Sequence, residues 1–307
     1  MMRGVRFTVG ARVARPLRRV RSAGVAAGAV TVLWVTATAL GQPGAPGDVA
    51  AAAARAAHGS AAVHDRARAA AEAARPPRRT AALQDGNVPY DGRFTFARIR
   101  FRTAFGMRFG GLNAEGQPPW EHDFPRAERN FLKILEELTL IRPHEEGHNV
   151  FTTDDPELSR FPVAYLSEPG FWVPTEEEVE GLSDYLRKGG FMIADDFRGR
   201  DWFNFEDQMR RVIPEGRFVQ LDGSEPIFDA FFRIEDLHNL ASPYGVEPIY
   251  LGLYEDNDPA KRLMVIANYN NDIGEYWEFS DVGYFPIDLS NEAYKLGVNY
   301  IVYALTH

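Results

Sequence analysis

The sequence predicts a mainly parallel, doubly wound α/β sheet over residues 90–307. Short apolar runs typical of strands alternate there with amphipathic helical segments, which is the order of a parallel sheet covered by helices on both faces. The hydrophobic fraction of 45% is ample for a packed core in a chain of 307 residues. Residues 1–89 do not show this alternation, so they form a separate region.

Residues 1–41 have the order of a secretory signal. Seven arginines lie within residues 3–21, and an uncharged run with Trp34 near its centre follows at 22–41. A basic region, an apolar region and small residues at the exit are the parts of a signal peptide. Cleavage after Ala39 or Gly41 is one interpretation. An uncleaved anchor is the other, because about 20 apolar residues span a bilayer. Both predict export to the cell envelope or periplasm.

Residues 42–89 are rich in Ala, Arg, Pro and Gly and poor in large apolar side chains. Such a segment cannot bury enough surface to offset its ordering entropy, so we predict a disordered linker. The charge is also divided, because residues 1–80 carry a net +10 and the remainder a net −19. An acidic folded region repels phosphate backbones and anionic lipids. We therefore expect no nucleic-acid partner, and membrane contact only through the N-terminal segment.

The first elements of the folded region are a strand and a helix. Residues 94–101 alternate apolar and polar side chains, which predicts an edge or first strand with one wet face. A helix follows over residues 125–141, with Pro125 in its first turn. Apolar residues three or four apart place one face of that helix on the sheet: Phe131, Leu132, Leu135 and Leu138.

The remaining elements continue the alternation. Strands are predicted at 149–152 and 161–166, and Thr175 caps a helix that ends at Gly189. The continuous apolar run 191–194 predicts a buried strand. After it we expect a helix at 205–212, a short extended segment at 218–221, paired strands at 248–254 and 262–268, and a closing helix at 292–305.

Polar side chains follow three of these strands directly. Ligands bind beyond the carboxyl ends of parallel strands, so we expect the binding site among these residues. Trp277, beside them, offers a flat face suited to sugar stacking. The other candidate ligand-binding residues are Glu168, Asp195, Asp196, Asn270, Asn271 and Asp272.

The adjacent acids Asp195 and Asp196 allow two interpretations. Carboxylates at the exit of a buried strand are costly unless they are bonded or solvated. Consecutive strand side chains point to opposite faces, so we do not expect both to bind one ion. Either one caps the following turn while the other pairs with Arg198 or Arg200, or the pair has a ligand or metal role. Glu168 is likewise either a third carboxylate of the site or a solvated loop residue.

The sequence requires no cofactor and assigns no catalytic residue. The cluster that contains Asp272, Glu275 and Glu278 offers hard oxygen donors, but it matches no calcium-loop spacing, so we predict no metal site. His122 and Asp123 are adjacent, and adjacent residues rarely face each other, so we interpret His122 as a surface histidine. The chain has no cysteine, which excludes disulfides, thiolate metal sites and a cysteine nucleophile.

Several motifs together indicate a family. The segments are DFPRAERNFLKILEELT at 123–139, GGFMIADDF at 189–197, NYNND at 268–272 and YKLGVNYIVYALT at 294–306. With these, residues 94–307 resemble the bacterial family called domain of unknown function 4159. The resemblance implies a flavodoxin-like sheet, as in class I glutamine-amidotransferase and trehalose-utilisation-like proteins. It implies no established activity.

In that superfamily a catalytic cysteine follows the strand that we match to 191–194, and here Asp195 follows instead. Glutaminase chemistry is therefore not expected. We expect an exported or membrane-tethered envelope protein that binds a partner protein or a glycan at the strand ends without catalysis. The alternative is a hydrolase that uses Asp195 or Asp196, with or without a divalent cation, on an envelope carbohydrate or amide.

Overall fold

The structure is a computed structural model, and it describes residues 86–103, 117–145 and 147–307. The signal or anchor predicted at 1–41 and nearly all of the linker predicted at 42–89 lie outside the described residues. Within the described residues, no helix combines the length and apolar character needed to cross a membrane.

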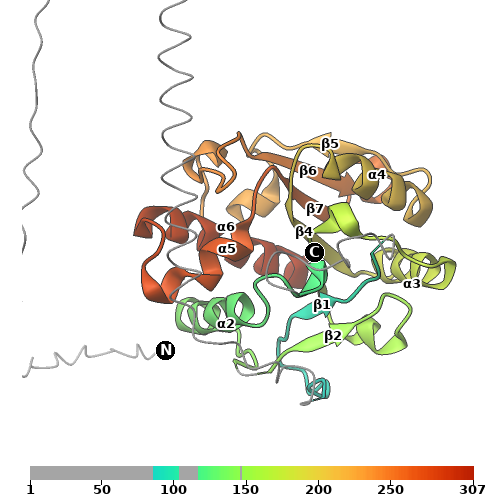
Figure 1. The fold of residues 1–307 in the computed structure, drawn as a ribbon, viewed down its shortest axis with the longest axis horizontal. Coiled ribbons are helices and arrows are strands. Elements are labelled where there is room, and N and C mark those ends of the chain that lie inside the picture. The colour runs from blue at the N-terminus through green and yellow to red at the C-terminus, as the bar shows by residue number, and fades with distance from the viewer. Residues whose placement is uncertain (1–85, 104–116, 146) are drawn as a thin grey trace, which may run out of the picture. The chain divides into compact units, whose positions relative to one another are not determined.

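The described residues contain a seven-stranded sheet with the order β2-β1-β3-β4-β7-β6-β5 (Figure 1). From β2 to β7 along this order, neighbouring strands pair in parallel, whereas β6 pairs antiparallel with both β7 and β5. The strands are β1 (Ala97–Ile99), β2 (Asn149–Phe151), β3 (Val163–Ser167), β4 (Phe191–Phe197), β5 (Phe218–Gln220), β6 (Ile249–Tyr254) and β7 (Leu263–Tyr269).

Helices cover both faces of this sheet and enclose two apolar cores. The helices are α2 (Arg126–Leu138), α3 (Glu176–Arg187), α4 (Asp201–Val212), α5 (Ile273–Glu278) and α6 (Ile287–Thr306). Residues of α2, α5 and α6 share one core with one face of the sheet, and residues of α3 and α4 share the other core with the opposite face. The α/β class and the mainly parallel sheet are therefore as predicted.

Short 3-10 helices join several of these elements. They are η1 (Pro119–Glu121), η2 (Pro156–Arg160), η3 (Pro169–Phe171), η4 (Pro226–Asp229), η5 (Leu237–Asn239), η6 (Glu255–Asn257) and η7 (Ser280–Val282).

The start of α3 shows how local sequence sets an element. Thr175 Oγ1 accepts a hydrogen bond from Glu178 N at 3.2 Å, and Thr175 N donates to Glu178 Oε2 at 2.8 Å. This reciprocal pair satisfies two backbone donors that the first turn of a helix leaves free. The helix that we expected after Thr175 therefore begins as predicted.

We expected an edge or first strand with one wet face, and β1 is the first strand of the described residues but is neither at an edge nor wet on one face. It lies between β2 and β3, and the side chain of Arg98 is 1% exposed. Arg98 Nε donates to Glu128 Oε1 on α2 at 2.7 Å, and its guanidinium lies 4.6 Å from the centre of the Tyr165 ring. The charge of Arg98 is therefore paired with a buried carboxylate and is not solvated by water.

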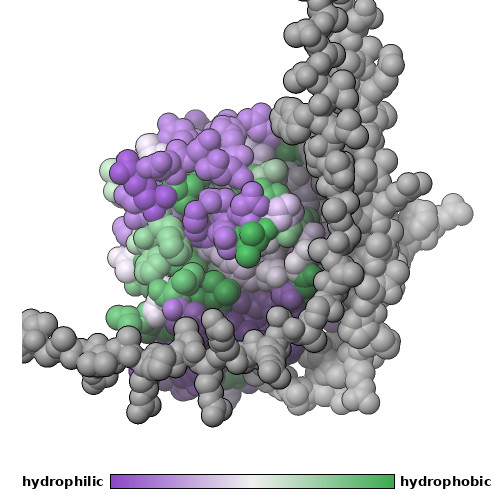
Figure 2. All heavy atoms as spheres, turned by 90° about the vertical axis from the view of Figure 1, so that its left-hand side faces the viewer, coloured by the Kyte–Doolittle hydropathy of each residue, from purple (hydrophilic) through white to green (hydrophobic). Residues whose placement is uncertain are grey.

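Helix α2 packs on the sheet through Phe131 and Leu135, which are fully buried, but Leu138 is 47% exposed. Leu138 is the last residue of α2 and lines an open groove of about 770 Å³ together with Ile287. Figure 2 looks onto the side of the domain where α2, α5 and α6 lie, and apolar surface forms a patch there among polar residues. The predicted apolar face of α2 is therefore correct except at its end.

Three further elements differ from expectation. Strand β4 continues to Phe197, so that Asp195 and Asp196 belong to it, and the polar segment after β7 forms the short helix α5. Helix α6 begins at Ile287, earlier than the expected residue 292.

Candidate functional site

A bulge at the end of β4 determines how its two acids are presented. The pairing between β4 and β7 shifts register between Ala194 and Phe197, and Asp196 has a φ of 61°. An extra residue in one strand re-aims the local side chains. Asp195 and Asp196 therefore do not follow the simple alternation of a regular strand.

Asp195 holds the carboxyl end of the sheet to the start of α5. Its Oδ2 accepts hydrogen bonds from Tyr165 Oη at 2.5 Å and from the backbone N–H groups of Ile273 and Gly274, both at 3.0 Å. Its Oδ1 accepts from Asn268 Nδ2 at 3.0 Å. Burial raises the pKa of Asp195 to about 6, although these hydrogen bonds oppose the rise. This carboxyl group links β3, β4, β7 and α5.

Asp196 contacts a different set of partners. Its Oδ2 lies 2.7 Å from His122 Nδ1, and its Oδ1 accepts a hydrogen bond from Tyr244 Oη. His122 is buried, so the interpretation of a surface histidine is wrong. The described residues directly before α2 bring His122 against the end of β4, where its imidazole meets a carboxylate.

Two more acids complete this group. Asp123 Oδ1 lies 3.5 Å from His122 Nδ1, and Asp272 caps α5 by accepting a hydrogen bond from Glu275 N at 2.9 Å. One candidate ligand atom from each of His122, Asp123, Asp196 and Asp272 lies within 4.8 Å of all the others. All four residues are at most 6% exposed. We call these four residues the His-Asp cluster.

The His-Asp cluster concentrates negative charge in a buried place. Burial raises the pKa values of Asp123 and Asp272 well above the ordinary range, and the neighbouring carboxylates raise them further. Burial lowers the pKa of the His122 imidazole. The charges of Asp123 and Asp196 outweigh that effect and hold this pKa well above its ordinary value. The cluster therefore favours bound cations, whether protons or metal ions.

Gly274 allows the residues of the site to approach closely. A Cβ atom at this position would lie 2.8 Å from Tyr165 Oη and 2.9 Å from Asp123 Oδ2. Real Cβ atoms essentially never approach so closely, so a side chain here would displace both groups. A glycine at this point of α5 lets Asp123 and Tyr165 lie close to the helix backbone.

Comparison with known families identifies the domain. The profile of the family described as domain of unknown function, DUF4159, matches residues 96–305. The chain belongs to this family. No curated protein matches it. The match extends from β1 to α6 and contains every residue of the His-Asp cluster, so the function of this DUF4159 domain has to be argued from its site.

The structure brings together only some of the residues that we expected at the strand ends of the DUF4159 domain. Asp196 and Asp272 belong to the His-Asp cluster, and Asp195 lies beside it as the anchor of α5. Asn271 donates to Tyr250 Oη at 3.4 Å, and its own Oδ1 accepts from Asp272 N at 3.0 Å. Asn270 is partly exposed, and its Oδ1 accepts from Gly199 N at 3.2 Å.

Glu168 and Trp277 lie outside the His-Asp cluster. Glu168 has a φ of 47° and precedes η3, with its backbone N–H donating to the carbonyl of Asp195. Trp277 is a core residue with 1% exposure, and its ring centre lies 4.5 Å from that of Phe131. Its Nε1 donates to the carbonyl of Ala293 at 3.1 Å. The structure therefore gives Trp277 a packing role and does not present a free face for a sugar.

Our sequence reasoning did not place His122 and Asp123 in the site. The signal that would have found them is their position between the first strand and the first helix. A connection that leaves the carboxyl end of a parallel strand lies at the same edge of the sheet as the other strand ends. We applied that rule to three later strands and not to β1.

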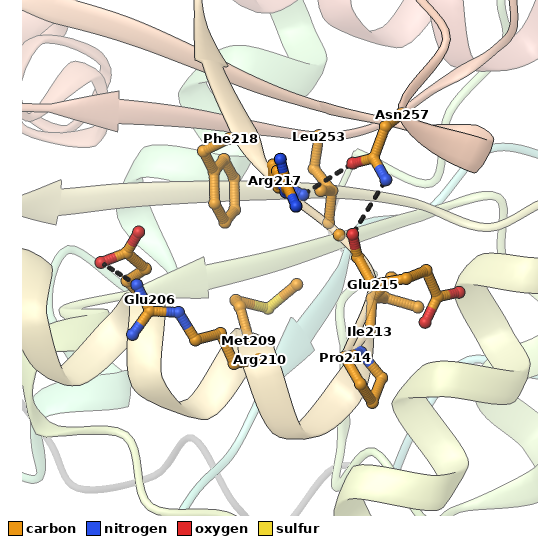
Figure 3. Close-up of a pocket in the computed structure, with 11 residues that line it drawn as sticks. Glu206, Met209, Arg210, Ile213, Pro214, Glu215, Arg217, Phe218, Leu253 and Asn257 are labelled. Atoms are coloured by element: carbon orange, nitrogen blue, oxygen red, sulfur yellow. Dashed lines mark hydrogen bonds and ion pairs between the residues drawn. The ribbon is translucent and has the colours of Figure 1, made fainter.

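A cavity of about 730 Å³ lies elsewhere, between the end of α4 and strands β5 and β6 (Figure 3). Leu253 in its wall pairs with Val265 near the start of β7, so the cavity is at the end of the sheet away from Asp196. Three of its charged side chains are in ion pairs, since Arg210 pairs with Glu206 at 3.0 Å and Glu215 pairs with Arg187 at 2.5 Å. We assign it no function.

Proposed function

We propose that this DUF4159 domain is a binding module whose His-Asp cluster holds a divalent cation. The observation that carries the proposal is the buried convergence of His122, Asp123, Asp196 and Asp272 within 4.8 Å. Three carboxylates beside one imidazole have more negative charge than the imidazolium can balance. A divalent cation would supply the missing positive charge. This proposal replaces our expectation that the chain has no metal site.

The donor set indicates which cation fits. Imidazole suits zinc and iron, and carboxylates suit manganese and magnesium, so a mixed set fits Mn²⁺, Fe²⁺ or Zn²⁺. Catalytic metal sites keep one coordination position open to substrate or water, whereas structural sites are closed. Because every candidate ligand is buried, the site fits a structural ion better than a catalytic one. Binding without catalysis is therefore the better supported function.

A titration with Mn²⁺ tests the proposal on the full chain after treatment with a chelator. We expect binding by isothermal titration calorimetry, with affinity reduced at least about tenfold in Asp196→Asn and Asp272→Asn. Asn preserves the cap of α5 at position 272. Asp184→Asn, an exposed acid on α3, is the matched control and should bind as the native chain does. Native protein that binds no Mn²⁺ or Zn²⁺ would contradict the proposal.

We also propose that the domain belongs to an exported or membrane-tethered envelope protein. The arginine-rich start, the apolar run 22–41 and the composition of 42–89 support this location. The mass of the native mature N-terminus tests it. A soluble cytoplasmic form that retains residues 3–21 would contradict export.

We also propose that the sheet is flavodoxin-like. The order β2-β1-β3-β4-β7 in the parallel part is, after renumbering along the chain, the order 2-1-3-4-5 of flavodoxin-like sheets. This order supports a place beside the class I glutamine-amidotransferase-like proteins, without their cysteine chemistry. A partner protein or glycan would reach the site from the rim where Asn270 is partly exposed.

Hydrolysis is the second candidate function, and the His122–Asp196 contact of 2.7 Å favours it. A histidine oriented by a carboxylate is the arrangement of a general base. Mn²⁺-loaded protein should then hydrolyse an envelope glycan or amide, and His122→Gln should remove that activity. Equal activity in the native chain and in His122→Gln would exclude this role of the histidine.

A further inference from the structure

A second group of acids lies directly beside the His-Asp cluster and shares one of its members. One carboxylate oxygen each from Asp123, Glu275 and Glu278 lies within 4.8 Å of the other two. Glu275 and Glu278 are three residues apart on α5, so they lie on the same side of the helix. All three side chains are buried. We call these three residues the bridge cluster, because Asp123 belongs to both groups.

Asp123 is placed to serve both groups. Its backbone has a φ of 62°. Its Oδ2 lies close to α5, 2.9 Å from the position that a Cβ atom on Gly274 would occupy. Its Oδ1 faces His122 at 3.5 Å, which makes it a contact of the His-Asp cluster. A carboxylate has two oxygens and can bind a different cation with each. Asp123 belongs to both groups, so it is the residue that can bridge them.

The charge of the two clusters together is strongly unbalanced. The two clusters together contain one imidazole, that of His122, and five carboxyl groups, from Asp123, Asp196, Asp272, Glu275 and Glu278. The nearby guanidinium of Arg98 is already held by Glu128 at 2.5 Å. One divalent cation would leave the total negative if the carboxyl groups were ionised. A second cation at the bridge cluster would bring the pair of clusters close to neutrality.

A buried oxygen of the shared residue gives an independent indication. Asp123 Oδ1 lies 3.5 Å from His122 Nδ1 but has no hydrogen-bond partner, although Asp123 is only 2% exposed. Buried polar atoms in native proteins nearly always have partners, and an ion is a common missing one.

We propose that the bridge cluster is a second divalent-cation site, joined to the first by the carboxylate of Asp123. This inference rests on the proposed function of the His-Asp cluster. Its donors are all carboxylates, so it suits a hard cation such as Mg²⁺ or Mn²⁺. Pairs of cations that share ligands lie about 3.5–4 Å apart in proteins. The domain then holds a carboxylate-bridged pair of cations beneath the ends of β3, β4 and β7.

Mn²⁺ binding to the full chain tests the pair, with calorimetry for the stoichiometry and electron paramagnetic resonance for the spacing. We expect two Mn²⁺ per native chain and a spin-coupled spectrum in place of the six-line signal of an isolated ion. Glu278→Gln and Glu275→Gln should each bind one Mn²⁺ with a six-line signal. The affinity of that remaining ion should stay within about threefold of the native first site. Glu180→Gln, an exposed acid on α3, should bind two.

The outcomes separate the two proposals. One Mn²⁺ in the native chain, unchanged in both glutamate variants, would overturn the second site and leave the first intact. Two Mn²⁺ without spin coupling would also overturn the bridged pair. No Mn²⁺ at all would overturn both sites. If circular dichroism shows that Glu278→Gln does not fold, the native spectrum and Glu275→Gln decide the question.

Discussion

Asp195 and Asp196 are neighbours in the sequence but bind different parts of the domain, because Asp196 has a φ of 61° in the bulge of β4. Asp195 accepts hydrogen bonds from β3, β7 and the start of α5, whereas Asp196 contacts His122 and Tyr244. In a regular strand the two side chains would point to opposite faces. The bulge instead lets one acid hold the fold while the other contributes to the candidate site.

Asp195→Ala should strongly destabilise the domain. It would leave the backbone N–H groups of Ile273 and Gly274 and the Asn268 amide without their acceptor. Each buried donor left unsatisfied costs about 1–3 kcal/mol, so we expect a loss of about 3 kcal/mol or more in the free energy of unfolding. Urea denaturation measures it, with Asp184→Ala as the exposed control. A loss below about 1 kcal/mol would mean that Asp195 does not anchor α5.

Gly274→Ala should disturb the candidate site more than the fold as a whole. The new methyl group would meet Tyr165 Oη and Asp123 Oδ2, and overpacking of this kind costs about 1–3 kcal/mol. Displacement of Asp123 should also weaken Mn²⁺ binding at least about tenfold. Gly86→Ala is the matched control, because a Cβ there meets nothing within 4 Å. Equal Mn²⁺ affinity in the two variants would show that Asp123 does not lie close enough to Gly274 to be displaced by a methyl group.

The sheet and the closeness of Asp196 and Asp272 could be predicted from the sequence. Apolar runs mark β4 and β7, and parallel strands end at one edge, so Asp196 and Asp272 could be expected near each other. The same rule applied to the end of β1 would have placed His122 at this edge, but the sequence does not show which residue His122 contacts. Its partner Asp196 lies 74 positions away along the chain, and only the folded connection before α2 brings them together.

Burial of polar groups was the other feature that sequence patterns did not reveal. Arg98 alternates with apolar residues as a solvent-facing residue would, yet Glu128 and Tyr165 enclose it. Trp277 lies among polar residues in the sequence, yet α5 turns it into the core beside Phe131. In both cases a helix that packs on the sheet buries the side chain. The amino acids next to it in the sequence do not indicate this tertiary contact.

Two leucines on α2 test the packing of that helix. Leu135 is fully buried and Leu138 is 47% exposed, although both belong to the same apolar stripe. Leu135→Ala should lower the free energy of unfolding by about 2–5 kcal/mol. Leu138→Ala should lower it by less than about 1 kcal/mol. Urea denaturation of the two variants provides the comparison, and equal losses would show that the end of α2 is covered.

Removal of the partner of Arg98 should be costly. Glu128→Gln would leave a buried guanidinium without its carboxylate, and a buried pair broken in this way loses about 3–5 kcal/mol. The pair of Glu206 and Arg210 on α4 is a suitable control because its arginine is largely exposed. Glu206→Gln should change the free energy of unfolding by less than about 1 kcal/mol. Similar losses in both variants would mean that Arg98 is solvated in solution.

The stability of the metal-free domain should fall as the pH rises above about 6.5. Burial lowers the pKa of His122, but Asp123 and Asp196 hold it well above its ordinary value in the folded chain. The folded state therefore binds this proton more tightly than the unfolded state. Its contribution is complete below about pH 6.5 and is lost as the pH rises through the folded pKa. The raised pKa values of Asp123 and Asp272 act in the same direction.

Melting temperatures with a chelator and with saturating Mn²⁺ measure this dependence. Bound Mn²⁺ replaces the protons of the cluster, so stability no longer depends on them. The melting temperature with Mn²⁺ should therefore change less with pH above about pH 7. His122→Gln cannot take up the proton, so its profile with the chelator should also be flatter than that of the native chain. A melting temperature that rises with pH in the chelated native protein would show that the buried acids are not held by protons. The charge balance argued for the His-Asp cluster would then be wrong.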